Sequence, residues 1–184
     1  MQTVVDRLGT QDFVLFNHMF SNIKEGDFYS DVTDKEVDEL LCLYPQNERI
    51  IKNFRYSRGI LTAELIDKDI SYSIAKPDYY TAEQLIMAIS QMGYLLSGLV
   101  IKNDEYINVD SSFYQPFLGK IKDLECFYTQ LNIKFKKKIL KKRINFIEMI
   151  INKMNYYPTK QRIYFDFIIR VGNSFYAEAQ LITT

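Results

Sequence analysis

The chain has 184 residues, of which 47% are hydrophobic and 25% charged, and its 23 basic residues balance 23 acidic ones. This length predicts one domain with a substantial core, and zero net charge excludes a global field that would attract nucleic acid or a membrane surface. Cys42 and Cys126 both lie in apolar sequence contexts. With no signal peptide at the N-terminus, we expect reduced core thiols in a cytoplasmic protein that has no metal site and no cofactor.

The first 48 residues are expected to form a helical segment ahead of the sheet. Residues 10–23 carry apolar side chains at mixed helical spacing, which predicts a short amphipathic helix. Residues 24–32 are typical of a loop. Thr33 and Glu36 fit a capping box, so a second helix is predicted to begin there and to end before Pro45.

From Ile50 the hydrophobic period changes to two, which predicts antiparallel strands. One segment runs through Tyr56 and is followed by a turn near Arg58 and Gly59. Two further segments, 60–66 and 69–75, lead into the longest helix.

The predicted helix 81–101 has no charged residue from Gln84 to Ile101, and Thr81 with Gln84 gives it a capped start. At about 100° per residue, most of its apolar side chains, Ile86 among them, form one broad arc that must be buried. A narrow polar seam headed by Glu83 remains. About 20 apolar residues would span a bilayer, but polar residues and glycines interrupt this run and no second span accompanies it. We therefore predict no membrane span and a helix enclosed by protein.

Residues 102–124 are turn-rich and predict no clear element. Alternation predicts strands at 131–135 and 144–151, with a basic turn between them, and a closing hairpin of 163–171 and 175–181 turned by Gly172 and Asn173. Strands on both sides of one long helix predict an α+β hot-dog fold, an antiparallel sheet wrapped around a central helix in a single domain, with 49–184 as its body. Proteins of this fold usually pair, with the active groove between protomers, so we expect a homodimer or higher homo-oligomer.

Four stretches resemble the long-chain fatty acyl-CoA thioesterase (FcoT-like) hot-dog family, whose relatives add glycine to 2-enoyl acyl-carrier-protein thioesters in isonitrile lipopeptide biosynthesis. They are Leu41-Cys42-Leu43-Tyr44-Pro45, TAEQLIMAISQMGY, NIKFKKKILKKRINF and the closing hairpin. The resemblance covers most of the chain after about Val37. It implies an enzyme that acts on fatty acyl or 2-enoyl thioesters of CoA or acyl-carrier protein.

The resemblance also implies site residues. Tyr44 falls at a functional tyrosine of the family, and Gln91 and Tyr94 match its helix pattern. Two family asparagines correspond to Thr81 and Ser90, and a second family tyrosine falls at Ser73, with Tyr72 beside it. Because those asparagines are replaced, the alternative is an acyl-thioester-binding or scaffold protein without catalysis.

Glu83 is the acid that a groove-lining helix would present to a thioester, as a general base for water or an amine or as an acid toward an enolate. Its alternative role is to complement the positive end of the helix, worth about 0.3 to 1 kcal/mol. Asp78, just before the cap, is the second candidate acid. The amides of residues 80–84 can hold an oxyanion. Four tyrosines can orient a carbonyl or simply pack: Tyr44, Tyr72, Tyr79 and Tyr80.

A cluster of basic residues occupies the predicted turn, in a window from Cys126 to Ile147 that contains no acid. Such a cluster indicates contact with the phosphates of CoA or phosphopantetheine, or with the acidic face of a carrier protein. The alternative is a solvated hairpin tip. Nucleic acid is not the expected partner, since the cluster lacks interleaved aromatics and a reader motif. Its members are Lys134, Lys136, Lys137, Lys138, Lys141, Lys142 and Arg143.

Overall fold

The computed structural model describes residues 30–68, 76–103, 111–160 and 162–184. The helix predicted at 10–23, the strand predicted at 69–75, and the candidate residues Tyr72 and Ser73 lie outside the described residues.

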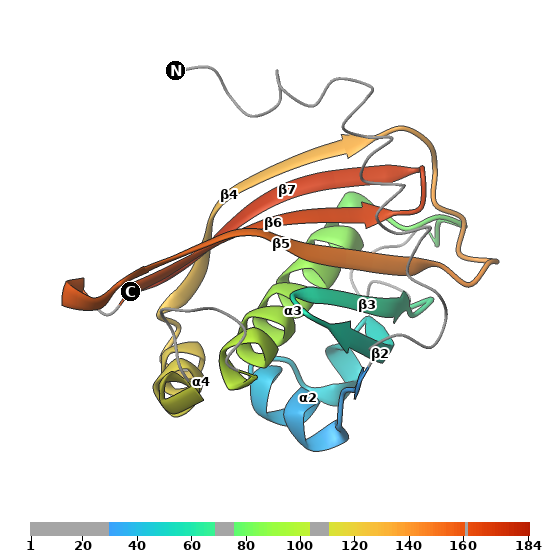
Figure 1. The fold of residues 1–184 in the computed structure, drawn as a ribbon. Coiled ribbons are helices and arrows are strands. Elements are labelled where there is room, and N and C mark those ends of the chain that lie inside the picture. The colour runs from blue at the N-terminus through green and yellow to red at the C-terminus, as the bar shows by residue number, and fades with distance from the viewer. Residues whose placement is uncertain (1–29, 69–75, 104–110, 161) are drawn as a thin grey trace, which may run out of the picture.

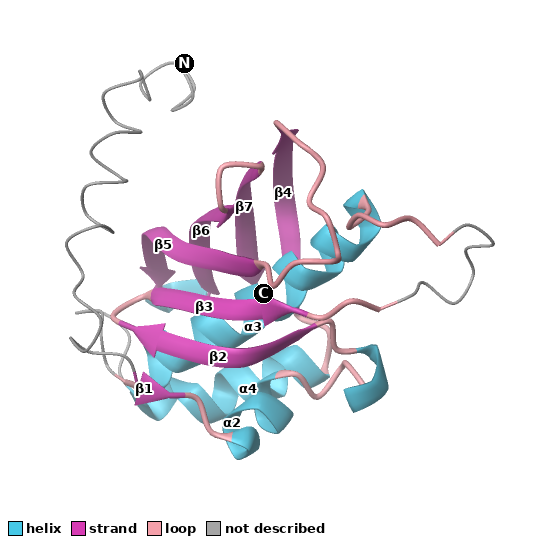
Figure 2. Ribbon diagram, turned by 90° about the vertical axis from the view of Figure 1, so that its right-hand side faces the viewer, coloured by secondary structure: helices cyan, strands magenta, loops and turns pink. Residues whose placement is uncertain are grey.

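Within the described residues, the strands form one seven-stranded sheet in the order β1-β2-β3-β5-β6-β7-β4. Every neighbouring pair is antiparallel. Figure 2 shows β1, β2 and β3 side by side, with the helices on one face of the sheet. The strands are β1 Ser30–Asp31, β2 Ile51–Ser57, β3 Ile60–Leu65, β4 Cys126–Phe135, β5 Phe146–Tyr157, β6 Arg162–Val171 and β7 Phe175–Thr183.

The helices of the described chain are α2 Asp34–Leu40, α3 Ala82–Lys102 and α4 Tyr114–Lys122, with short 3₁₀ turns at Gln46–Glu48, Ser111–Phe113 and Pro158–Lys160. Figure 1 shows the sheet curving over α3, with α2 and α4 on the side of α3 away from the sheet. Strand β6 shows why the sheet faces α3: alternate residues from Ile163 to Val171 are buried, while those between them are half-exposed. The predicted hot-dog arrangement is confirmed.

Both predicted capping boxes are present. The Glu36 amide donates to Thr33 Oγ1 at 3.3 Å and the Thr33 amide to Glu36 Oε2 at 2.8 Å. At α3 the Gln84 amide donates to Thr81 Oγ1 at 3.3 Å, and the Thr81 amide donates to Gln84 Oε1 at 2.9 Å. These reciprocal bonds satisfy donors that a helix start leaves unpaired.

Helix α2 ends at Leu40, so the prediction that it ends before Pro45 is confirmed. Three other predictions need correction. Residues 114–122, predicted to form no clear element, are helix α4, whose buried face seals the end of the core. Ile86, placed on the buried arc of α3, is 40% exposed, because the first turns of α3 extend past the elements that bury residues 91–101 on every side. Cys42, expected in the core, is exposed.

In the part of the chain that the structure describes, α3 is the one helix long and apolar enough to cross a membrane. Of that apolar window, 83% is buried inside the protein, as is typical of a core helix.

Candidate functional site

The start of α3 and the basic turn, residues 136–145, lie against each other. The Tyr80 amide donates to the Ile139 carbonyl at 2.9 Å, and the Lys141 amide donates to the Asp78 carbonyl at 2.9 Å. Tyr79 and Leu140 form an isolated antiparallel bridge between these two bonds. The structure therefore brings together two groups that the sequence separates by about sixty positions.

Several candidate side chains surround this helix start. Asp78 and Glu83 are both exposed to solvent. Tyr79 is half-buried, and the Lys138 ammonium lies 4.8 Å from its ring centroid, within the range of a cation–π contact. Thr81 is occupied as the helix cap. The acids that the sequence proposed are thus accessible at the positive end of α3.

Tyr80 has a structural role. Its side chain is buried and its hydroxyl donates to the Leu65 carbonyl at 3.1 Å. Burial raises its pKa to about 12, and the nearby Asp67 and Glu64 carboxylates add to the shift. Tyr80 therefore keeps its proton at neutral pH and ties the helix start to β3.

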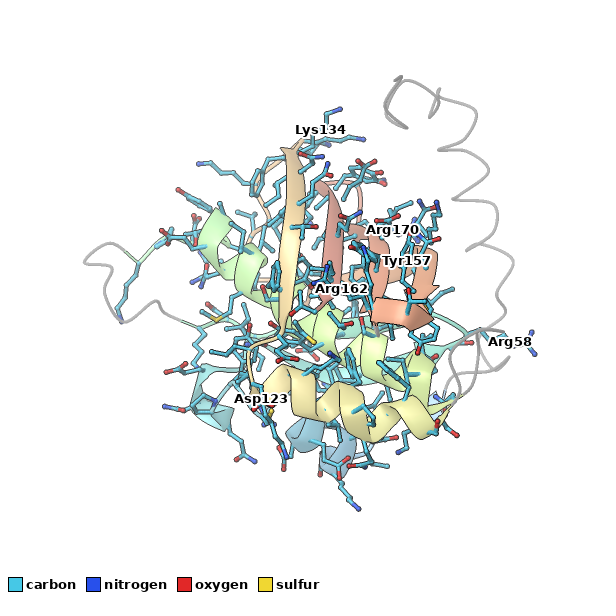
Figure 3. All side chains as sticks on the ribbon, turned by 90° about the vertical axis from the view of Figure 1, so that its left-hand side faces the viewer. Arg58, Asp123, Lys134, Tyr157, Arg162 and Arg170 are labelled. Atoms are coloured by element: carbon cyan, nitrogen blue, oxygen red, sulfur yellow. The ribbon has the colours of Figure 1, made fainter. Side chains whose placement is uncertain are left out.

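Six of the seven predicted cations are exposed: Lys134, Lys136, Lys137, Lys138, Lys142 and Arg143. Lys141 is different, because its side chain is only 5% exposed and its ammonium lies 3.3 Å from Asp67 Oδ1. The same ammonium donates to the Lys68 carbonyl at 3.3 Å. Lys141 fixes the turn from inside, and its charge is matched by a carboxylate. Figure 3 shows Lys134 at the end of β4 opposite to Asp123.

A second cluster lies near the middle of α3. The side chains of Tyr44 and Ser90 are hydrogen-bonded to each other, and burial raises the Tyr44 pKa although the Ser90 bond acts against it. The ring centroids of Tyr44 and Tyr94 are 6.2 Å apart. Tyr44 is half-buried and keeps its proton at neutral pH, so it can donate a hydrogen bond but cannot act as a base.

Gln91 and Tyr94 are committed to the protein's own backbone. Gln91 is fully buried; its Oε1 accepts from the Ile50 amide at 3.1 Å and its Nε2 donates to the Glu48 carbonyl at 3.2 Å. The Tyr94 hydroxyl donates to the Cys126 carbonyl at 3.1 Å, and burial raises the Tyr94 pKa. Both side chains hold neighbouring segments against α3.

The two clusters are separate. Thr81 and Ser90 are nine positions apart, which is about 13 to 14 Å along a helix. Glu83 and Ser90, seven positions apart, lie on the same face of α3. Between them stand Ile86, 40% exposed, and Met87, 39% exposed. We call this line of residues, from Glu83 through Ile86 and Met87 to Ser90, the α3 strip.

Tyr128 of β4 is a contact that the sequence did not reveal. Its hydroxyl donates to the Ile89 carbonyl at 2.9 Å, and its ring lies against Gly93, where a Cβ atom would stand only 1.8 Å from the Tyr128 hydroxyl oxygen. Beyond Tyr128 the inner face of β4 continues with Leu131 and Ile133, both half-buried. The strand is therefore tied to α3 at Gly93 and less fully covered toward the helix start.

The cysteines and acids form no metal centre among the described residues, which contain no group of three or more His, Cys, Asp or Glu placed to hold an ion. Cys126 is buried, and burial raises its pKa to about 12. Cys42 lines a hollow of about 550 Å³ between α2 and α4, on the far side of the molecule from the basic turn.

No family model matches the chain, and no characterised protein matches its sequence significantly. Among solved structures, a proposed thioesterase from Shewanella oneidensis has 8% identity and a TM-score of 0.49, covering 83% of this chain and 99% of that one. A hypothetical thioesterase from Streptococcus pneumoniae, solved with coenzyme A, has 11% identity and a TM-score of 0.45, with coverage of 83% and 97%. The dehydratase heterocomplex ApeI:P from Xenorhabdus doucetiae has 10% identity and a TM-score of 0.48, with coverage of 80% and 90%.

Proposed function

We propose that this chain is an enzyme acting on fatty acyl or 2-enoyl thioesters, with the thioester at the start of α3 and the acyl tail along the α3 strip. The observation that carries the proposal is the order of groups on one surface. Exposed cations of the basic turn come first, then the exposed Glu83 at the helix start, then the uncovered apolar Ile86 and Met87. A thioester carried on a phosphate-bearing arm has charge, carbonyl and apolar tail in the same order.

Each group has a role in this chemistry. The first-turn amides of α3 lie at the positive end of the helix, where they can stabilise an oxyanion on the thioester carbonyl. In hydrolysis, Glu83 accepts a proton from water as its oxygen attacks the carbonyl carbon; the C–S bond then breaks and the thiolate takes up the proton. In amine addition, the glycine nitrogen attacks the β-carbon and its proton passes to the α-carbon. The tyrosine hydroxyl of the Tyr44–Ser90 pair is a donor farther along the strip.

The proposal includes a homodimer formed through β4. This ten-residue strand lies at one end of the sheet order and pairs only with β7 among the described strands. An edge of this length offers free backbone donors and acceptors for pairing. Addition of a second copy there would also cover the half-buried inner face of β4. Hydrogen exchange tests this: slow exchange of those β4 amides that do not face β7, in a species of twice the monomer mass, supports the dimer, and fast exchange of the same amides in a monomer contradicts it.

Product analysis tests the reaction. We would incubate the protein with dodecanoyl-CoA and, separately, with crotonyl- or decenoyl-carrier protein plus glycine, and identify products by mass. Glu83→Gln should lower turnover about 10²- to 10⁴-fold, the usual contribution of a general base. Asp123→Asn, at an exposed acid after α4, is the matched control and should leave turnover unchanged. Absence of turnover with every substrate would refute the proposal.

The second candidate function is acyl-thioester binding without catalysis. Thr81 and Ser90, which stand where the resembled family has asparagines, are already engaged in the helix cap and in the bond to Tyr44. This alternative predicts that thioester binding survives Glu83→Gln, Asp78→Asn and Tyr44→Phe, and that no variant, nor the parent, forms product.

A further inference from the structure

We propose that the basic turn is a preformed docking surface for the acidic face of an acyl-carrier protein, and that CoA phosphates are not its main ligand. The inference rests on the proposed function, which left the carrier open between CoA and protein. It is carried by three observations: how the turn is anchored, which side chains it exposes, and what lies beside it.

The turn is anchored to three other elements. The amides of Lys136 and Lys137 both donate to the Ser174 carbonyl, at 2.9 and 3.2 Å, which fixes the turn to the β6–β7 connection. Its middle is bonded to the start of α3, as described above. Its end is bonded to β3, because the Leu65 amide donates to the Asn145 carbonyl at 2.8 Å.

The side chain of Asn145 closes the turn on itself. Its Nδ2 donates to the Leu140 carbonyl at 2.8 Å and to the Arg143 carbonyl at 2.7 Å. Together with the buried Lys141, these two hydrogen bonds hold the turn in one conformation before a partner binds. A solvated hairpin tip would need none of these bonds. Preorganisation lowers the entropy that a surface loses on binding, which is a property expected of a recognition surface.

The turn exposes apolar side chains among its cations. Ile144 is 71% exposed, Phe146 at the start of β5 is 54% exposed, and Leu140 is 40% exposed. A single exposed apolar residue is ordinary, but these three fall within seven positions and share a connection with exposed lysines. Protein interfaces have an apolar centre and a polar, charged rim. A ligand that offered only phosphate groups would make no favourable apolar contact with Ile144.

The hollow beside the turn does not suit a phosphate. It encloses about 320 Å³ and is lined by Phe146, Glu148, Arg170, Gly172 and Asn173. Its arginine is already paired, since Arg170 Nε and Nη2 both lie 2.8 Å from Glu148 Oε1. Burial raises the Glu148 pKa, against the opposite effect of Arg170. A neutralised hollow with an exposed phenylalanine at its rim fits an apolar side chain of a protein partner better than an anion.

The location of the surface fits a carrier with a flexible arm. The turn touches the start of α3 directly, with Lys138 over the Tyr79 ring and the Asp78 backbone bonded to the turn. A carrier docked on the exposed cations would deliver its thioester to Glu83 from the same side. The complementary charge is negative, because the window from Cys126 to Ile147 holds cations and no acid.

The test measures carrier binding and CoA use separately. The probes are a bacterial fatty-acid-synthesis acyl-carrier protein without its prosthetic arm, the same carrier bearing a decanoyl thioester, and decanoyl-CoA. Calorimetry gives the affinity for the armless carrier, which depends on docking alone. Kinetics with the two decanoyl thioesters show whether a variant changes KM for the carrier, for CoA, or for both.

Two variants probe the surface. Ile144→Ser should weaken binding of the armless carrier about tenfold, as loss of an apolar interface centre does. Changing Lys136, Lys137 and Lys138 together to Ser should weaken binding and flatten its salt dependence, because the Debye length falls from about 10 Å at 0.1 M to about 3 Å at 1 M salt. Both variants should raise KM for the decanoyl carrier, leave its kcat nearly unchanged, and leave KM for decanoyl-CoA within about twofold.

Matched controls are available elsewhere on the surface. Leu124→Ser changes a leucine that is 69% exposed between α4 and β4. Lys122, Lys153 and Lys160, all exposed and outside the basic turn, can be changed together to Ser. Neither control should alter carrier binding. Thermal melts of the surface variants should stay near that of the parent, since exposed like charges contribute little to stability.

Three results would overturn the inference. Carrier affinity unchanged in both surface variants would show that the turn is not the docking site. KM for decanoyl-CoA rising in parallel with KM for the carrier would identify a phosphate site. A DNA duplex competing for the turn with equal affinity and salt slope would identify a nonspecific polyanion surface. Armless-carrier binding that depends on Ile144, without turnover of any thioester, would uphold the surface and refute the proposed enzyme.

Discussion

At Gly93 the backbone of α3 lies against Tyr128 of β4, and replacing this glycine tests that contact. A Cβ at this position would stand 1.8 Å from the Tyr128 hydroxyl oxygen and 2.9 Å from Tyr128 Cζ. Tyr128 cannot turn away freely, because its ring is packed against the core and its hydroxyl is bonded to the Ile89 carbonyl. Gly93→Ala must therefore displace the ring or the strand.

The opposing contributions to unfolding free energy can be compared. Alanine in place of glycine favours the helix by about 1 kcal/mol. Overpacking in a core costs about 1 to 3 kcal/mol, and leaving the partly buried Tyr128 hydroxyl without its partner costs up to about 1 to 3 kcal/mol more. We expect Gly93→Ala to lower the free energy of unfolding by about 2 to 4 kcal/mol. For a domain of this size that is a fall in Tm of about 5 to 15 °C.

A double-mutant cycle with Tyr128→Phe identifies the cause. Removing the hydroxyl removes the 1.8 Å contact while the 2.9 Å contact with Cζ remains, so the second change should partly rescue Gly93→Ala. We expect a favourable coupling of about 1 to 3 kcal/mol from chemical denaturation of the parent, both single variants and the double variant. If Gly93→Ala alone instead raises Tm, the gain in helix propensity is the larger effect, and the inference that Tyr128 packs tightly against Gly93 is wrong.

Two further variants test other contacts of the fold. Burial raises the Glu36 pKa, but the hydrogen bonds from Lys102 and Thr33 outweigh burial and leave this pKa below 4.5. The stability that the Glu36 carboxylate adds is therefore present at neutral pH and is lost as the pH falls through the lowered pKa. Glu36→Gln should therefore lower the free energy of unfolding by about 0.5 to 1 kcal/mol at pH 7, and melts from pH 7 to 3 should show the difference closing; a constant difference would contradict this. Gln91→Leu leaves the buried Ile50 amide without an acceptor and should lower the free energy of unfolding by about 1 to 3 kcal/mol, measured by denaturant unfolding. Unchanged stability with a raised KM would instead indicate that Gln91 binds substrate.

The starts of helices α2 and α3 could be predicted from the sequence, because a helix cap is formed by residues that lie close together in the chain. Thr33 with Glu36 and Thr81 with Gln84 marked the starts of α2 and α3 correctly. Helix α4 was missed for an equally local reason. Its sequence contains Pro116 and Gly119, two residue types that argue against predicting a helix. Pro116 is nevertheless tolerated, because it lies in the first turn, where a residue needs no intrahelical N–H bond.

The candidate site was predicted less completely, because its geometry depends on distant segments. Nothing near Gln91 in the sequence indicates that its amide would bond residues 48 and 50. Likewise, no pattern around Lys141 distinguishes it from its exposed neighbours. The carboxylate that pairs with it belongs to Asp67, two residues after the end of β3. Ile86 follows the apolar period of α3 and yet faces outward, because whether a helical turn is covered depends on which elements reach it.

The most direct test of the central claim is a crystal structure with S-(2-oxododecyl)-CoA, a ketone analogue in which a methylene separates sulfur from carbonyl so that no thioester can be cleaved. The account predicts the ketone oxygen about 3 Å from the first-turn amides of α3, with Glu83 beside it. It also predicts the alkyl tail over Ile86 and Met87, pointing toward Ser90. A tail lying in the hollow between α2 and α4, or a carbonyl remote from the start of α3, would contradict it.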